Sequence, residues 1–117
     1  MQKDENDLRE RTKEFALGVI RMFSALPKTT EAQVLGKQLL RSGTSIGANY
    51  HEAFRARSKL EFIAKCGDSL REIEETAYWL ELLVDAKIIS ADKLRPLRAE
   101  CDELTAIFVT ILKRSKE

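Results

Sequence analysis

The stretch QLLRSGTSIGANYHEAFRARS, residues 38–58, decides the fold, because it places small and polar residues where a buried helix face would carry leucines. Gly43 and Gly47 lie four residues apart, with Ser42 and Ala48 beside them. Each glycine inside a helix costs about 1 kcal/mol relative to alanine, so packing has to compensate for the pair. The stretch therefore predicts a helix face with few side chains, which another helix can approach closely.

Apolar residues recur at helical spacing along the chain and divide it into four segments. The first apolar stripe runs to Leu26 and stops before Pro27, which cannot continue a helix. The third alternates by three and four residues from Cys66 to Val84, the spacing of packed bundle helices. Pro96 falls near the first turns of the last segment and predicts a kink or a late start there. We expect helices at about residues 5–26, 30–56, 59–87 and 91–114.

Three of the predicted helices begin at residues that can cap them. Thr30 with Gln33, and Ser58 with Glu61, have the spacing of a capping box, in which a hydroxyl accepts from a backbone N–H three residues on. Ser90 is a suitable cap for the last helix. These residues predict sharp helix starts after short turns.

Short connections between consecutive helices require antiparallel neighbours. We therefore expect one all-α domain, residues 1–117, folded as an antiparallel up-down-up-down four-helix bundle. No segment shows the period of two that marks a strand. Facing residues on the second and third helices would have numbers that sum to about 113. Arg41 would then lie level with Glu72, and Glu52 with Glu61.

The charges nearly balance, since 20 Lys and Arg residues stand against 19 Asp and Glu residues for a net charge of +1. A field this weak does not by itself imply a nucleic acid or a membrane as partner. Residues 28–57 carry five positive and two negative charges, whereas residues 58–89 carry four positive and seven negative. These segments are electrostatic complements, which fits their packing on each other as well as it fits an external ligand.

Cysteine content and hydrophobicity indicate the cellular compartment. Cys66 and Cys101 are too few and too far apart for a disulfide framework, and we expect reduced thiols in the core. The predicted register separates them by about 18 Å along the bundle, which excludes a bond between them. The charged N-terminal residues lack the apolar core of a signal peptide, and no run approaches the length of a membrane span. We expect a cytoplasmic protein with no membrane partner.

Polar residues on the two middle helices form stripes that would face each other. The second helix contributes Arg41, Ser45, Asn49 and Glu52, and the third Lys65, Ser69, Glu72 and Thr76. A solvated surface is one interpretation of these stripes. Small neighbours and flanking apolar residues favour partial burial instead, and buried polar groups must be paired. The candidate polar network, between helices or between subunits, comprises Arg41, Ser45, Asn49, Glu52, Ser69 and Glu72.

The sequence carries no pattern typical of an active site. His51 is the only histidine, so the paired Glu-x-x-His motifs of a di-iron bundle and the two histidines of a zinc protease cannot form. Glu72, Glu74 and Glu75 are better explained as ion-pair partners and solvated residues than as a catalytic pair. We expect no catalytic, cofactor-binding or metal-ligating residue, no small-molecule substrate and no enzymatic activity.

The polar stripe resembles a motif of a bacterial four-helix bundle family, which includes proteins encoded in intervening sequences of 23S ribosomal RNA genes. The family pattern reads roughly Q-L-R-R-A-A-x-S-I-x-x-N-I-A-E-G, and the residues that match it are Gln38, Leu39, Arg41, Ser45, Ile46, Asn49 and Glu52. One branch carries S-G-T-S-I-G-A-N, intact at residues 42–49, followed by E-F-I-x-K at residues 61–65. The resemblance covers roughly residues 8–115. Leu40 stands where a second arginine is common, which weakens any inferred phosphate binding.

This resemblance implies a homopentamer arranged as a barrel, and one relative is the accessory protein of the reverse transcriptase of diversity-generating retroelements. We expect a ring-like homo-oligomer, in which the apolar surface of the third helix is covered: Phe62, Tyr78, Trp79 and Leu82. A self-assembling scaffold or adaptor is the leading hypothesis. The alternative is an RNA-binding accessory factor, associated with a ribosome or a reverse transcriptase, that contacts phosphate through Arg55, Arg57 and Lys59.

Overall fold

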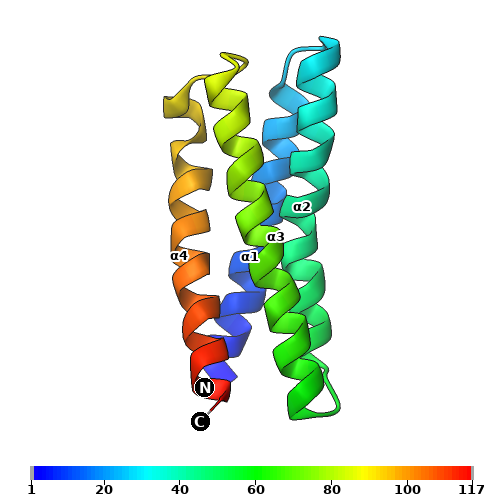
Figure 1. Cartoon of the computed structure of the whole chain (residues 1–117), viewed down its shortest axis with the longest axis vertical. Helices are drawn as coiled ribbons and strands as arrows, with labels where there is room; N and C mark the ends of the chain where they lie inside the picture. Colours follow the sequence, from blue (N-terminus) through cyan, green and yellow to red (C-terminus); the bar gives the residue numbers. More distant parts are fainter. Residues whose placement is uncertain (1, 117) are drawn as a thin grey trace.

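Four antiparallel α-helices make up the described part of the chain. The computed structural model describes the backbone of residues 2–116 and the side chains of residues 7–116. The helices are α1 (Gln2–Ala25), α2 (Thr30–Phe54), α3 (Lys59–Asp85) and α4 (Ala91–Ser115). They run alternately up and down in a rod of 46 × 21 × 21 Å, in which α3 lies in front and α1 behind (Figure 1). The predicted up-down-up-down bundle is therefore confirmed, and each helix begins and ends within about three residues of its predicted bounds.

Hydroxyl side chains cap the starts of the last three helices. Ser58 accepts a hydrogen bond from the backbone N–H of Glu61, and Ser90 accepts one from Lys93, as predicted. The predicted cap at Thr30 is wrong. Thr29 holds the extended backbone conformation that a cap requires and accepts from the N–H of Ala32, whereas Thr30 is already helical.

Pro96 lies inside α4 rather than before it. The helix begins at Ala91, so the proline falls in its second turn, where it cannot donate a backbone hydrogen bond. Of the two outcomes predicted for Pro96, a kink and a late start, the late start is wrong, because the helix runs from Ala91 to Ser115 with the proline inside it.

The glycine-rich face of α2 packs against α1. A Cβ atom built at Gly43 would lie 2.8 Å from Cγ2 of Val19, and one built at Gly47 would lie 3.1 Å from Oγ1 of Thr12. Both distances are shorter than an ordinary van der Waals contact. The predicted close approach of another helix is confirmed, and α1 is the helix that makes it.

Buried hydroxyl groups join the opposite side of α2 to α3. The Oγ atom of Ser69 donates to the carbonyl oxygen of Ile46 at 2.9 Å, and Oγ1 of Thr76 donates to Oγ of Ser42 at 2.9 Å. Ser42, Ser69 and Thr76 are fully buried. Because these donors have partners, the hydroxyl layer sets the register of the two helices without leaving buried polar groups unpaired.

The predicted register between α2 and α3 is offset by as much as one helical turn. Arg41 does meet Glu72, but Glu52 pairs with Lys65 instead of lying level with Glu61. Side chains tilt toward the N-terminus of their own helix, and these tilts point in opposite directions in an antiparallel pair. Side-chain tips that meet therefore start from backbone positions that are not level, which the predicted sum ignored.

Both cysteines are free and fully enclosed in the core, as predicted. Burial raises the pKa of the Cys66 thiol and of the Cys101 thiol to about 12. We expect both thiols to resist DTNB in the native protein and to react once urea unfolds it, because the thiolate is the reactive form. Rapid labelling of the native protein by DTNB would show that the thiols are not enclosed.

The raised pKa of the two thiols also predicts how stability depends on pH. Unfolded thiols ionise near pH 9 and the folded ones do not, so the free energy of unfolding should fall as the pH rises from 9 toward 12.

Candidate functional site

The upper part of the polar face between α2 and α3 is a surface ion-pair cluster. Nη1 of Arg41 lies 3.5 Å from Oε1 of Glu72, and Nη2 of Arg41 forms a second ion pair with Glu75. Glu75 also accepts a 3.0 Å hydrogen bond from Nε1 of Trp79. The Arg41 side chain remains 49% exposed, so this cluster is accessible to water.

The rest of the candidate polar network bonds in two different ways. Ser45 donates to the carbonyl of Arg41 at 2.7 Å and Asn49 donates to the carbonyl of Ser45 at 3.1 Å, so both serve their own helix. Ser69 is the only member that is fully buried and bonds across to the neighbouring helix. At the lower end Glu52 pairs with Lys65 at 2.6 Å, and this hydrogen bond raises the pKa of Lys65.

The structure shows two partners on this face that the sequence analysis had not placed in the network. Ser42 had been treated only as a small neighbour, yet its hydroxyl accepts from Thr76 in the core. Glu75 had been assigned no specific partner, yet it joins Arg41 to Trp79. The helical spacing of Thr76 within the third-helix stripe could have indicated the first of these pairs, whereas the second depends on side-chain orientation.

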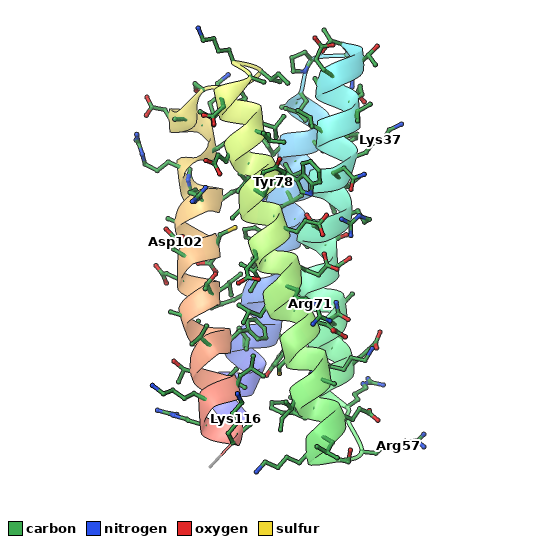
Figure 2. The ribbon with its side chains drawn as sticks, in the orientation of Figure 1. Lys37, Arg57, Arg71, Tyr78, Asp102 and Lys116 are labelled. Carbon is green, nitrogen blue, oxygen red and sulfur yellow. The ribbon has the colours of Figure 1, made fainter. Side chains whose placement is uncertain are left out.

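A basic end of the bundle forms around the turn between α2 and α3. The candidate nucleic-acid contacts Arg55, Arg57 and Lys59 are all exposed there. The up-down topology brings the last turn of α4 to the same end, which adds three exposed cations: Lys113, Arg114 and Lys116. Figure 2 shows both segments at this end, with Arg57 in the turn between α2 and α3 and Lys116 directly after α4. This second basic segment was not among the predicted contacts, although the predicted topology already implied its position.

The apolar surface of α3 is smaller than predicted. Phe62 and Trp79 are partly buried and pack against the core, and Leu82 is also partly covered. Tyr78 is 52% exposed and stacks edge-on against Trp79, with 5.2 Å between ring centroids. We define the α2–α3 face as the outward surface of these two helices. Its exposed large apolar residues are Leu60 in the first turn of α3, Val34 on α2, and Tyr78, at the front of α3 in Figure 2.

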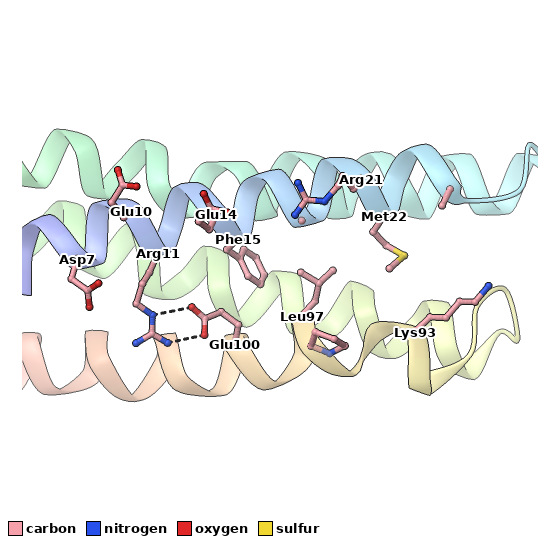
Figure 3. A pocket seen from close by; sticks show the side chains of 13 residues that line it. Asp7, Glu10, Arg11, Glu14, Phe15, Arg21, Met22, Lys93, Leu97 and Glu100 are labelled. Atoms are coloured by element: carbon pink, nitrogen blue, oxygen red, sulfur yellow. Dashed lines mark hydrogen bonds and ion pairs between the residues drawn. The ribbon is translucent and has the colours of Figure 1, made fainter.

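A groove opens between α1 and α4, which pack least closely of the four neighbouring pairs. Its cavity has a volume of about 650 Å³, and Figure 3 shows the lining side chains. Phe15, Met22 and Leu97 supply apolar surface, and a Cβ atom built at Gly18 would meet Leu97 at 3.2 Å. We call this feature the α1–α4 groove.

One arginine spans the narrow part of the α1–α4 groove. Nε and Nη2 of Arg11 donate to the two carboxylate oxygens of Glu100 at 3.0 and 2.7 Å (Figure 3). Nη2 also donates to Glu103 at 2.9 Å. These hydrogen bonds raise the pKa of Arg11 further above its usual range. A two-pronged arginine–carboxylate pair is directional as well as charged, so it holds the two helices together where few apolar contacts do.

The described residues include neither a metal-ligating cluster nor a membrane-spanning helix. Among residues 7–116, no three His, Cys, Asp or Glu side chains gather closely enough to hold a metal ion. Within the described helices, none is long and apolar enough to cross a membrane.

Comparisons with known proteins place the chain among four-helix bundle proteins. Residues 4–110 match the family model described as "23S rRNA-intervening sequence protein". A crystal structure of a protein of unknown function, from the S23 ribosomal protein family of Bacteroides thetaiotaomicron, superimposes with a TM-score of 0.87 at 36% sequence identity. The match covers 93% of this chain and 97% of that one. No curated protein is similar enough in sequence to match. The chain therefore belongs to the 23S rRNA intervening-sequence protein family.

Proposed function

We propose that this protein is a non-enzymatic scaffold that assembles with copies of itself into a ring, and the resemblance to its family favours a homopentamer. The proposal rests on two surfaces of this small bundle, the α2–α3 face and the α1–α4 groove. Tyr78 and Val34 are each more than half exposed on the α2–α3 face, and the α1–α4 groove leaves apolar side chains beside an open cavity. We take these two surfaces as the sites at which copies of the chain would contact one another.

The mass in solution tests the proposal. Light scattering at micromolar concentration and ordinary salt should give a mass several times the 13.3 kDa of one chain. A pentamer would be about 67 kDa, five times that value. Dilution should lower the mass if subunits exchange, because assembly follows mass action. A mass of one chain across this range would overturn the proposal.

An RNA-contacting role is the second candidate, and the composition of the basic end favours it. Six exposed cations from the α2–α3 turn and the last turn of α4 gather at one end of each subunit: Arg55, Arg57, Lys59, Lys113, Arg114 and Lys116. In a ring these ends would repeat around one rim, so several weak phosphate contacts would act together. RNA or a ribonucleoprotein would then be the partner, held through its backbone rather than through base sequence.

Filter binding against structured ribosomal RNA tests this second role. Replacing Arg55, Arg57 and Lys59 with alanine should weaken binding and reduce the dependence of affinity on salt, because fewer counterions are released. The matched control replaces three exposed cations elsewhere, Lys28, Lys37 and Arg95, and should leave both quantities nearly unchanged. If the wild-type protein retains no RNA at low salt, or if both triple variants behave alike, the basic end is not an RNA site.

A further inference from the structure

We infer that the contact between α1 and α4 is a conformational latch: Arg11 holds it closed, and loss of its hydrogen bonds lets these two helices part while α2 and α3 stay packed. This inference concerns a single subunit and does not depend on the proposed assembly. Arg11 donates to Glu100 and to Glu103 on α4. Among the side chains of residues 7–116, no other hydrogen bond or ion pair joins α1 to α4. We call this set of bonds the Arg11 latch.

Open space lies beside the Arg11 latch in both directions along the two helices. The cavity of the α1–α4 groove, about 650 Å³, reaches Met22 and Lys93 at its upper end. A second cavity of about 580 Å³ lies toward the lower end, where Leu8 and Ile111 are among its lining residues. Arg11 lines both cavities, so it crosses from α1 to α4 where the two spaces adjoin. Few apolar contacts therefore oppose a separation of α1 from α4.

The order of the helices leaves this contact without a connecting turn. Short turns join α1 to α2 and α3 to α4 at the upper end of the bundle, and the turn at the lower end joins α2 to α3 (Figure 1). The neighbouring pairs also pack more closely, with α1 against the glycines of α2, and α2 bonded to α3 through the buried hydroxyl layer. Local opening occurs where packing contacts are fewest. The lower halves of α1 and α4 are therefore the parts of the bundle that separate at the lowest cost.

Release of the Arg11 latch would uncover apolar side chains that the closed bundle encloses. Phe15 and Leu97 line the upper cavity and Leu8 lines the lower one, and each of the three is at most 9% exposed. The side chains of Arg11 and Glu100 are 29% and 27% exposed, so the latch is within reach of water while the apolar side chains are not. A two-pronged arginine–carboxylate pair is among the stronger hydrogen-bonded contacts in proteins. One charged contact therefore decides whether this apolar surface is enclosed.

Hydrogen exchange, measured by mass spectrometry of peptides, tests the latch. In Arg11→Gln, the amides of residues 8–15 and 100–108 should exchange about tenfold faster than in the wild type, because loss of the charged hydrogen bonds raises the population of the open state. The facing amides of α2 and α3 should keep their wild-type rates. Arg11→Lys keeps the charge but cannot bond both oxygens of Glu100 in the same planar geometry, so its rates should be intermediate.

Two further measurements distinguish the latch from a general loss of charge. Arg95→Gln is the matched control, because it removes an exposed arginine of α4 whose ion pair with Asp92 lies within its own helix. Its exchange rates should match the wild type. The dye ANS, which fluoresces on exposed apolar surface, should give several-fold more fluorescence with Arg11→Gln than with Arg95→Gln, at equal helical circular dichroism.

Several results would overturn the inference. Unchanged exchange in Arg11→Gln would show that Arg11 does not hold α1 and α4 together. Equal acceleration in all four helices would show a loss of global stability instead of a local opening, and the intermediate variant Arg11→Lys gives the same comparison if Arg11→Gln fails to fold. An effect of Arg95→Gln as large as that of Arg11→Gln would assign the change to net charge. The samples compared should have equal mass in light scattering, because neighbouring copies would also protect α1 and α4.

Discussion

Replacing Gly43 with leucine is expected to destabilise the bundle by about 3 kcal/mol, near the upper end of the usual cost of overpacking a core. Even a single Cβ atom at this position would lie 2.8 Å from Cγ2 and 3.0 Å from Cγ1 of Val19, whose side chain is fully buried. Valine has one strongly preferred side-chain rotamer in a helix and cannot turn away. The backbones of α1 and α2 would have to separate. Urea unfolding of the wild type and the variant measures the difference.

Gly67 provides the matched control for this prediction. It also lies inside a helix, but a Cβ atom built there has nothing within 4 Å. Gly67→Ala should therefore stabilise the protein by up to about 1 kcal/mol through helix propensity alone. Gly43→Ala has the same propensity gain and meets Val19, so it should be less stable than Gly67→Ala. Equal stability of the two alanine variants would show that α1 does not approach α2 as closely as the structure has it.

Replacing Ser69 with leucine is the second large effect, and we expect a loss of about 3 kcal/mol. Ser69 is fully buried between α2 and α3, where its hydroxyl donates to the carbonyl of Ile46. Leucine would need more volume than the contact leaves and would remove the only side-chain donor that this carbonyl has from α3. Ser69→Ala separates the two causes, because it removes the hydrogen bond without adding volume and should cost about 1 kcal/mol.

Ser45 is the control for the hydroxyl layer. It belongs to the same candidate network, but its hydroxyl donates to the carbonyl of Arg41 in its own helix and its side chain is half-buried. A serine that bonds back to its own helix adds little stability, so Ser45→Ala should change the free energy of unfolding by less than about 0.5 kcal/mol. Chemical denaturation of the two alanine variants compares them directly. If Ser69→Ala and Ser45→Ala lower the free energy of unfolding by similar amounts, the buried hydroxyl contributes no more to stability than the half-buried one.

The polar residues on α2 and α3 fall into two groups, buried hydroxyl residues and exposed charged residues. Ser42, Ser69 and Thr76 are enclosed and make bonds that hold the two helices in register. Arg41 and Glu52 stay exposed and pair across the surface, where ion pairs add little to stability. The buried layer therefore contributes more to the register of the two helices than the exposed ion pairs do.

The sequence alone determined the elements and their order. Helix bounds follow from the period of the apolar residues and from the caps at Ser58 and Ser90, which act within a few residues of themselves. The antiparallel order follows from short turns. The same local features carry the family motif between residues 38 and 65, so membership of the family was also within reach. Each of these conclusions depends on interactions between residues that are close together in the sequence.

Only the tertiary structure decided which surfaces meet. The glycines of α2 predicted a close approach, but the partner helix, α1, emerged from packing of the whole bundle. The tilt of side chains shifted the pairing of α2 with α3, so Glu52 forms an ion pair with Lys65 and Thr76 forms a hydrogen bond with Ser42. The α1–α4 groove has no sequence motif at all, because it is the space left where the other three helix pairs pack more tightly. Such features depend on the balance of many long-range contacts, and that balance exists only once the chain has folded.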